Sequence, residues 1–273
     1  MKVYIQTDIE GVAGFCFFEN YEDKGMQNVQ HRCRMSRLLT AEVNAAVTGA
    51  FGAGATEVVV NDSHGSGYNI QFEDLDPRCE IIHGRLCSGP HWLPEFDESF
   101  HALVLVGMHA MCGTPNAILP HSRWEVNDGE ILLSEASMAA ALAGHRNVPT
   151  LFVSGDDKIV AEMRGKIPAI RHVQVKKALG AFQARSLIPA RSCERIGMGV
   201  RDALAHVGDI TPYRIPGPLR LNLIDSPNHA PPFKRILDTP VEAATIEDAF
   251  LQAARQMPWN KFNVELPDGF RYP

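Results

Sequence analysis

Short apolar runs separated by longer amphipathic stretches dominate the first 160 residues of the chain. Near-continuous apolar runs, typical of strands buried on both faces, predict strands at residues 3–7, 57–61, 102–106 and 150–153. Apolar positions at helical spacing predict a helix over residues 35–51, and an Ala-rich segment predicts another over residues 135–143. Buried strands that alternate with helices indicate an α/β fold, with a mainly parallel sheet core flanked by helices.

The pattern is less regular in the second half of the chain. Helices are predicted at residues 190–206 and 246–256 and a strand at residues 219–224, with proline-rich breaks between them. We therefore expect two units, an α/β core over residues 1–165 and a smaller C-terminal α+β lobe over residues 166–273.

Composition and charge narrow the possible functions. The chain has 273 residues, 45% of them hydrophobic, and its net charge of −6 comes without a basic stripe, which argues against nucleic acid as a partner. The longest apolar run is far too short to cross a membrane, and the first residues lack the features of a signal peptide. The six cysteines form no CxxC pair, so reduced thiols in a cytoplasmic protein are the simplest expectation.

Two carboxylates follow the first predicted strand directly. Asp8 and Glu10 are two positions apart, and a strand projects such residues to the same side. Neighbouring carboxylates repel each other and resist dehydration unless a cation or a shared proton relieves them. The carboxyl end of a strand is also where open α/β sheets bind their ligands. A metal site is therefore one hypothesis for this pair, and a capping or salt-bridge role is another.

Three further residues could complete a metal site. His64 follows the second predicted strand, His109 follows the third, and Glu135 opens the Ala-rich helix. If the strands are parallel, we expect these side chains to converge with Asp8 and Glu10 at one edge of the sheet. Three carboxylates with two imidazoles suit a pair of divalent ions such as Zn²⁺, with Asp8 as a bridge. Taken singly, each residue also has an ordinary role in a loop or at a helix start.

Several short motifs carry a family resemblance. They occur in one order over roughly the first 160 residues: MKVYIQTDIEG, EVVVNDSHG, LVLVGMHA with TPNAILPHS, VNDGE with SEASMAA, and VPTLFVSGDD. On this set the chain resembles the zinc-dependent D-aminopeptidases associated with bacterial dipeptide transport, which are self-compartmentalising metallopeptidases.

The resemblance implies a role for each candidate residue. It makes residues 1–165 a metal-binding core with two zinc ions per subunit, whose ligands would be Asp8, Glu10, His64, His109 and Glu135. His121 corresponds to the catalytic histidine of the family. Two features depart from the family pattern: Gln6 stands where a serine is usual, and the segment from His109 to His121 is one residue longer.

The resemblance also implies an activity and an assembly. Members hydrolyse the amino-terminal residue of short peptides that contain D-amino acids, such as D-Ala-D-Ala, with metal-activated water. They form homo-oligomers, as pentameric rings stacked into a decamer.

Two other functions stay open at the level of the sequence. A dinuclear metal hydrolase that acts on a phosphoester or another amide is one, although a phosphoesterase would favour basic side chains near the metals, and these loops are poor in Lys and Arg. A peptide-binding protein with a structural metal is the other, but it would need a closed site of four ligands.

Overall fold

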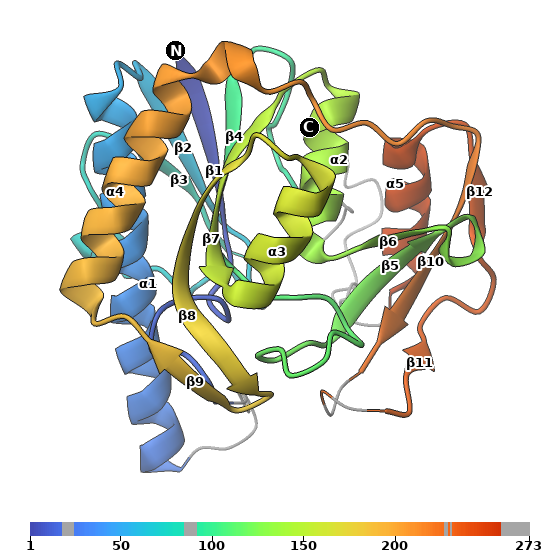
Figure 1. The fold of residues 1–273 in the computed structure, drawn as a ribbon, viewed down its shortest axis with the longest axis horizontal. Helices are drawn as coiled ribbons and strands as arrows, with labels where there is room; N and C mark the ends of the chain where they lie inside the picture. Colours follow the sequence, from blue (N-terminus) through green and yellow to red (C-terminus); the bar gives the residue numbers. More distant parts are fainter. Residues whose placement is uncertain (18–24, 85–91, 227–228, 230, 258–273) are drawn as a thin grey trace, which may run out of the picture.

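The computed structural model describes residues 1–17, 25–84, 92–226, 229 and 231–257. A seven-stranded sheet forms its centre, in the order β3-β2-β1-β4-β7-β8-β9 (Figure 1). The strands are β1 (Lys2–Thr7), β2 (Glu57–Asp62), β3 (Glu80–Ile82), β4 (Ala102–Met108), β7 (Thr150–Asp156), β8 (Arg171–Gly180) and β9 (Gln183–Ser186). Every neighbouring pair is parallel except β8 and β9. β1 lies between β2 and β4 and pairs with both of them.

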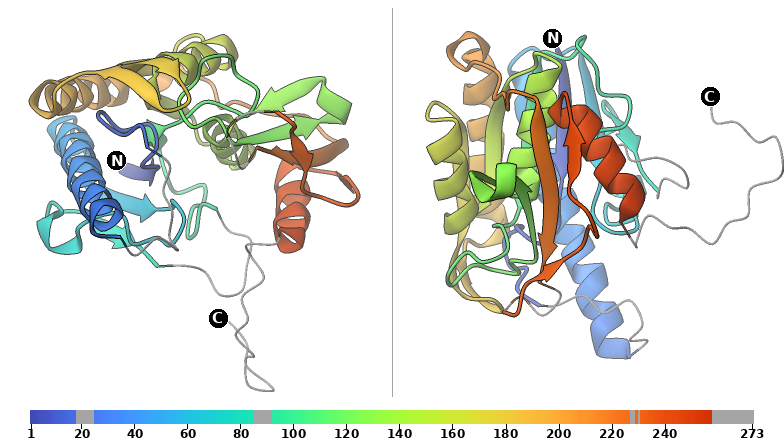
Figure 2. Two further views of the ribbon diagram at one scale, coloured as in Figure 1. Left: turned by 90° about the horizontal axis from the view of Figure 1, so that it is seen from below. Right: turned by 90° about the vertical axis from the view of Figure 1, so that its right-hand side faces the viewer.

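Helices flank this sheet. They are α1 (Met26–Gly52), α2 (Glu135–His145), α3 (Asp157–Lys166) and α4 (Pro189–Ala205). α1 and α4 pack against each other, and α2 packs against α3 (Figures 1 and 2). Asp156 caps α3 by accepting hydrogen bonds from the backbone N–H groups of Lys158 and Ile159, over 2.7 and 2.9 Å. α1 begins nine residues before its predicted start. None of these nine residues is buried, and they show no apolar stripe from which a helix could be predicted.

A second, antiparallel sheet lies beside the first, in the order β11-β10-β5-β6, with β12 also paired to β10. Its strands are β5 (Ser122–Val126), β6 (Ile131–Leu133), β10 (Leu219–Asp225), β11 (Lys234–Arg235) and β12 (Val241–Ala243). α5 (Ile246–Gln256) packs against β10 and β12. Short 3₁₀ turns occupy Phe72–Asp74, Asn127–Gly129 and Val207–Asp209.

The predicted α/β class with a mainly parallel core is confirmed, and the separate antiparallel sheet is the smaller unit. The division at residue 165 stays a prediction. Each sheet contains strands from both sides of that residue, because β8 and β9 belong to the larger sheet and β5 and β6 belong to the same sheet as β10. Among the described residues, no helix combines the length and the apolar character that crossing a membrane requires.

Candidate metal centre

The turn after β1 carries the first two candidate ligands. β1 ends at Thr7, so Asp8 and Glu10 lie in the turn and not on the strand, and strand alternation does not orient them. The turn is instead held against the end of β4, where the Gly11 N–H donates to the Gly107 carbonyl over 2.7 Å. Both carboxylates are buried there. The two acids therefore face the same site because the chain turns, which differs from the predicted reason.

A loop after β2 brings His64 to Asp8. The carboxylate of Asp62 accepts hydrogen bonds from the backbone N–H groups of Asn69 and Ile70, over 2.6 and 2.8 Å. The side-chain amide of Asn69 then donates to the His64 carbonyl over 2.6 Å. These bonds fold the loop back on itself. They leave His64 Nδ1 2.9 Å from Asp8 Oδ1.

His109 follows β4 and lies at the centre of the cluster, with 1% of its side chain exposed. Its Nδ1 lies 2.8 Å from the Ala110 carbonyl. Because a carbonyl only accepts, Nδ1 must carry the proton, which leaves Nε2 free to bind a metal through its lone pair. The nearest carboxylate oxygens to Nε2 belong to Asp8, Glu10 and Glu135, at 3.5, 3.4 and 3.7 Å.

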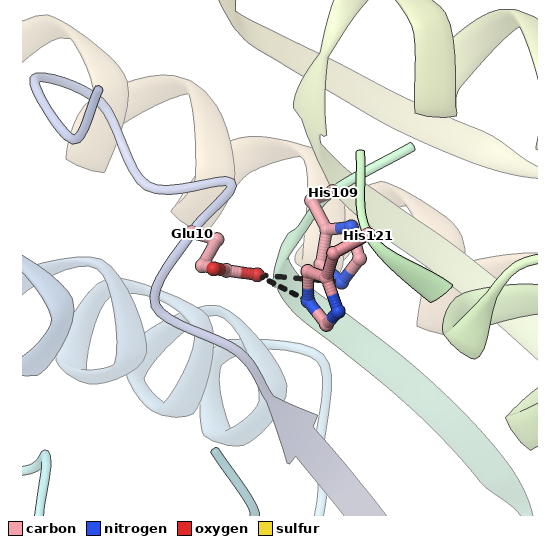
Figure 3. Close-up of side chains that lie close together, drawn as sticks. All are labelled: Glu10, His109 and His121. Carbon is pink, nitrogen blue, oxygen red and sulfur yellow. Dashed lines mark hydrogen bonds and ion pairs between the residues drawn. The ribbon is translucent and has the colours of Figure 1, made fainter. Parts of the chain in front are cut away.

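Residues next to strands of the second sheet form the other side of the cluster. Glu135 is the first residue of α2, and its Oε1 accepts a hydrogen bond from Ser122 Oγ over 2.6 Å. His121 directly precedes β5, and its Nε2 lies 2.9 Å from Glu10 Oε2. The rings of His121 and His109 stack with centroids 4.5 Å apart (Figure 3). Glu135 was expected at the edge of the parallel sheet, but it reaches the site from beside β5 and β6.

Two residues that lie near the site were not singled out from the sequence. Asp225, at the end of β10, places Oδ1 3.7 Å from His121 Nδ1. It directly follows the predicted strand at residues 219–224, so the signal that singled out Asp8 could have found it. Lys176, inside β8, is fully buried and donates to backbone carbonyls of the β1 turn, including that of Glu10. No strand was predicted over residues 171–180, so no local signal marked this lysine.

Burial and charge act against each other on the ionisable groups. Burial disfavours the charged form of Glu10, yet His121, His109 and His64 hold its pKa well below the usual range. Glu135 is likewise buried, and His109 and His121 lower its pKa to about 2. Burial lowers the pKa of His109, but the surrounding carboxylates outweigh it and raise that pKa to about 9. Burial also lowers the pKa of His121, but the facing carboxylates outweigh it and hold that pKa well above the usual value.

These observations fit a metal site. Asp8 Oδ2 and His109 Nε2 are buried, and neither has a hydrogen-bond partner among the residues that the structure describes. Unpaired buried polar atoms are costly, and a cation between them would remove that cost. Carboxylate and imidazole together are also common ligands of zinc.

Three sets of residues could each hold one ion, because each offers three ligand atoms within 4.8 Å of one another. The sets are Asp8 with Glu10 and His64, Asp8 with His109 and Glu135, and Glu10 with His109 and His121. The first two sets share Asp8 and together include all five predicted ligands. The third set would make His121 a ligand.

The Gln6 side chain, which replaces the usual serine of the family pattern, lies on β1. Its Oε1 accepts a hydrogen bond from Asn61 Nδ2 over 2.7 Å, and its Nε2 donates to the Trp92 carbonyl over 3.4 Å. The Gln6 side chain therefore links β1 to β2 by a hydrogen bond, just before the turn that carries Asp8.

Comparison with known proteins identifies the family. The sequence profile of Peptidase_M55, described as D-aminopeptidase, matches residues 1–235. A D-aminopeptidase of Bacillus subtilis (strain 168) is 30% identical over 223 residues, which cover 79% of this chain and 78% of that protein. The solved structure of the Zn-dependent D-aminopeptidase DppA from Bacillus subtilis, described as a self-compartmentalizing protease, is similar with a TM-score of 0.79 at 26% identity, over 94% of this chain and 99% of that one. The chain therefore belongs to the D-aminopeptidase family Peptidase_M55.

Proposed function

We propose that this protein is a zinc aminopeptidase that removes the amino-terminal residue of short peptides, with a preference for D-amino acids as in D-Ala-D-Ala, and that it uses two zinc ions per subunit. The observation that carries the proposal is the pair of ligand sets that share Asp8. Asp8, Glu10 and His64 would hold one ion, and Asp8, His109 and Glu135 the other. When bound, paired zinc ions polarise a carbonyl and make water a better nucleophile at neutral pH.

The residues of the chain prepare the site for that chemistry. The imidazoles around Glu10 keep its carboxylate ionised, and the bond from Nδ1 of His109 to the Ala110 carbonyl fixes that ring. Ser122 holds the carboxylate of Glu135. These bonds orient the ligands before substrate binds, which lowers the cost of reorganisation during the reaction.

His121 is the residue that we assign to proton transfer. Its side chain is 28% exposed, against 1% for His109, so it lies on the open side of the cluster where a substrate can enter. The carboxylates of Glu10 and Asp225 face its two ring nitrogens and favour the protonated ring. A proton on Nε2 can stabilise the developing oxyanion or pass to the leaving amine.

Stereochemistry, assembly and location rest on other support. The family description, the similar Bacillus subtilis sequence and the similar solved structure support the preference for D-amino acids. The self-compartmentalizing character of the similar structure supports a homo-oligomer, which we propose to be a pentameric ring or a decamer of two rings. A cytoplasmic location belongs to the same proposal.

Hydrolysis of matched D-Ala and L-Ala dipeptides tests the function. The purified protein is assayed as isolated, after treatment with a chelator, and after zinc is added back. We expect zinc to restore the release of D-Ala, with little release from the L series. Zinc-restored activity on the L series alone would overturn the stereochemistry, and a folded, zinc-loaded protein that cleaves neither would overturn the proposed activity.

A further inference from the structure

A buried lysine contacts the turn that carries the first metal ligands. Lys176 is in β8, and 1% of its surface is exposed. Its ammonium donates hydrogen bonds to three backbone carbonyls, those of Glu10, Val12 and Phe15, over 2.5, 3.0 and 2.6 Å. All three acceptors lie in residues 8–15, which we call the β1 loop.

The number of acceptors matches the chemistry of the side chain. A lysine ammonium has three N–H donors and no acceptor, so three carbonyls satisfy it completely. Burying a cation without such partners is strongly unfavourable. Conversely, removal of the ammonium would leave three buried carbonyls without these donors. Lys176 and the β1 loop therefore constrain each other.

The contact spans a considerable part of the sheet. β4 and β7 separate β8 from β1, so the lysine reaches the loop from a strand that does not pair with β1. Glu42 of α1 holds the same loop from another element, since its Oε1 accepts a hydrogen bond from the Ala13 N–H over 3.1 Å. The loop is thus fixed by a cation on its carbonyls and by a carboxylate on one of its amides.

The bond to Glu10 connects this network to the site. Lys176 holds the carbonyl of Glu10, while the carboxylate of the same residue lies 2.9 Å from His121 Nε2 and 3.4 Å from His109 Nε2. A rotation of the Glu10 backbone would break the first contact and redirect the carboxylate. Mispositioning by about 1 Å at a catalytic site is enough to cost orders of magnitude in rate.

We propose that Lys176 is a positioning residue of the metal centre, which holds the β1 loop in the conformation that aims Asp8 and Glu10 at the zinc ions. The inference rests on the proposed zinc function. It assigns Lys176 no contact with substrate or metal.

The test is zinc affinity, measured by competition with a chromophoric chelator on the full chain, for Lys176→Met. Methionine keeps the length and apolar stem of lysine but removes the donors. Lys177→Met is the matched control, because it makes the same charge change at an exposed position of the same strand. Val175→Ala is a second control, since it destabilises the buried side of β8 without touching the loop contacts.

We expect zinc affinity to fall about 10- to 100-fold in Lys176→Met and to stay unchanged in both controls. The kcat for D-Ala-D-Ala should fall with it at limiting zinc. Wild-type affinity in folded Lys176→Met, or an equal loss in Val175→Ala, would overturn the role of Lys176 alone. Failure of the unaltered protein to bind zinc would instead overturn the proposed function together with this inference.

If Lys176→Met does not fold, the double variant Lys176→Met/Glu42→Gln decides the question. It removes a buried cation and a buried carboxylate together, which is better tolerated than removing one. The glutamine oxygen can still accept from Ala13. Weakened zinc binding in the double variant would support the proposal, and wild-type affinity would overturn it.

Discussion

Nε2 of His121 lies 2.9 Å from Oε2 of Glu10, although Glu10 follows a strand of the parallel sheet and His121 precedes a strand of the antiparallel sheet. Glu10 is at the carboxyl edge of the parallel sheet, and His121 enters β5 of the antiparallel sheet. The candidate centre therefore lies where the two sheets meet. This geometry allows His121 to serve either as a proton donor or as a ligand, and the two roles make different predictions.

Replacing His121 separates catalysis from metal binding. In His121→Ala we expect two zinc ions per subunit to remain and kcat to fall about 10²- to 10⁴-fold, as for loss of a general acid. Metal analysis and steady-state kinetics of one preparation measure both. His172→Ala, at an exposed position of β8, is the matched control and should behave as wild type. A parallel loss of zinc and activity in His121→Ala would show that His121 is a ligand.

Asp8 should matter more for metal content than any ligand of a single ion. Because Asp8 belongs to both ligand sets, Asp8→Ala should bind close to no zinc, whereas His64→Ala should keep about one ion per subunit. Native mass spectrometry at graded zinc concentrations distinguishes these stoichiometries. The bridging role would be refuted by one tightly bound ion in Asp8→Ala.

The stability of the metal-free protein should depend on pH through His109. Its folded-state pKa is raised from 6.5 to about 9, so its contribution to stability is complete below pH 6.5 and is lost as the pH rises toward 9. Zinc reverses this trend, because it binds the deprotonated ring. Thermal melts with chelator should decline over this range, and less steeply for His109→Gln. A decline of the same slope in that variant would contradict the assignment.

At low pH, the stability of the metal-free protein should instead fall as the pH falls, through Glu135. The folded-state pKa of Glu135 is lowered from 4.5 to about 2, so its contribution is present above pH 4.5 and is lost as the pH falls toward 2. Glu135→Gln in the metal-free protein should therefore flatten the melting temperature between pH 4.5 and 2. If the melting temperature of Glu135→Gln falls between pH 4.5 and 2 as steeply as that of the unaltered protein, other groups control this dependence.

The turn after β1 should tolerate no side chain at Gly11. An added Cβ would lie 2.1 Å from the Met108 carbonyl oxygen and 2.4 Å from the Gly107 carbonyl carbon, and both are backbone atoms. We expect Gly11→Ala to cost about 1–3 kcal/mol in free energy of unfolding and to weaken zinc binding. Gly165→Ala in α3 is the contrasting variant, because nothing lies within 4 Å of the position that its methyl group would take and alanine favours helix. Equal stability of the two variants in urea would contradict this account.

Much of the fold and of the candidate site could be predicted from local sequence. Parallel strands buried on both faces are apolar along their whole length, so β1, β2, β4 and β7 stand out. The polar residues that end three of them, Asp8, His64 and His109, stand out for the same reason. The ends of parallel strands share one edge, which explains why these residues meet.

The second sheet could not be predicted in this way. β5 alternates buried and half-buried residues over only Ser122–Val126, and its partner β10 lies about 100 positions later. Such pairing is decided by contacts between distant segments and not by local pattern. His121 was found only through the family resemblance, and Glu135 was expected at the edge of the other sheet. The approach of both residues to the site depends on β5.

β8 was not predicted because its sequence has few apolar residues, and two consecutive lysines, Lys176 and Lys177, interrupt them. Its buried positions include Val173 and Val175, but Lys176 follows them and breaks the apolar pattern. A charged side chain is buried here only because three carbonyls more than 160 positions earlier surround its ammonium. No local rule contains that information.

The central claim is that two zinc ions share Asp8, and anomalous diffraction at the zinc edge from zinc-loaded crystals tests it most directly. We predict two peaks per subunit, one among Asp8, Glu10 and His64 and the other among Asp8, His109 and Glu135. A single peak among Glu10, His109 and His121 would contradict the account, because it would make His121 a ligand and leave Asp8 without a bridging role.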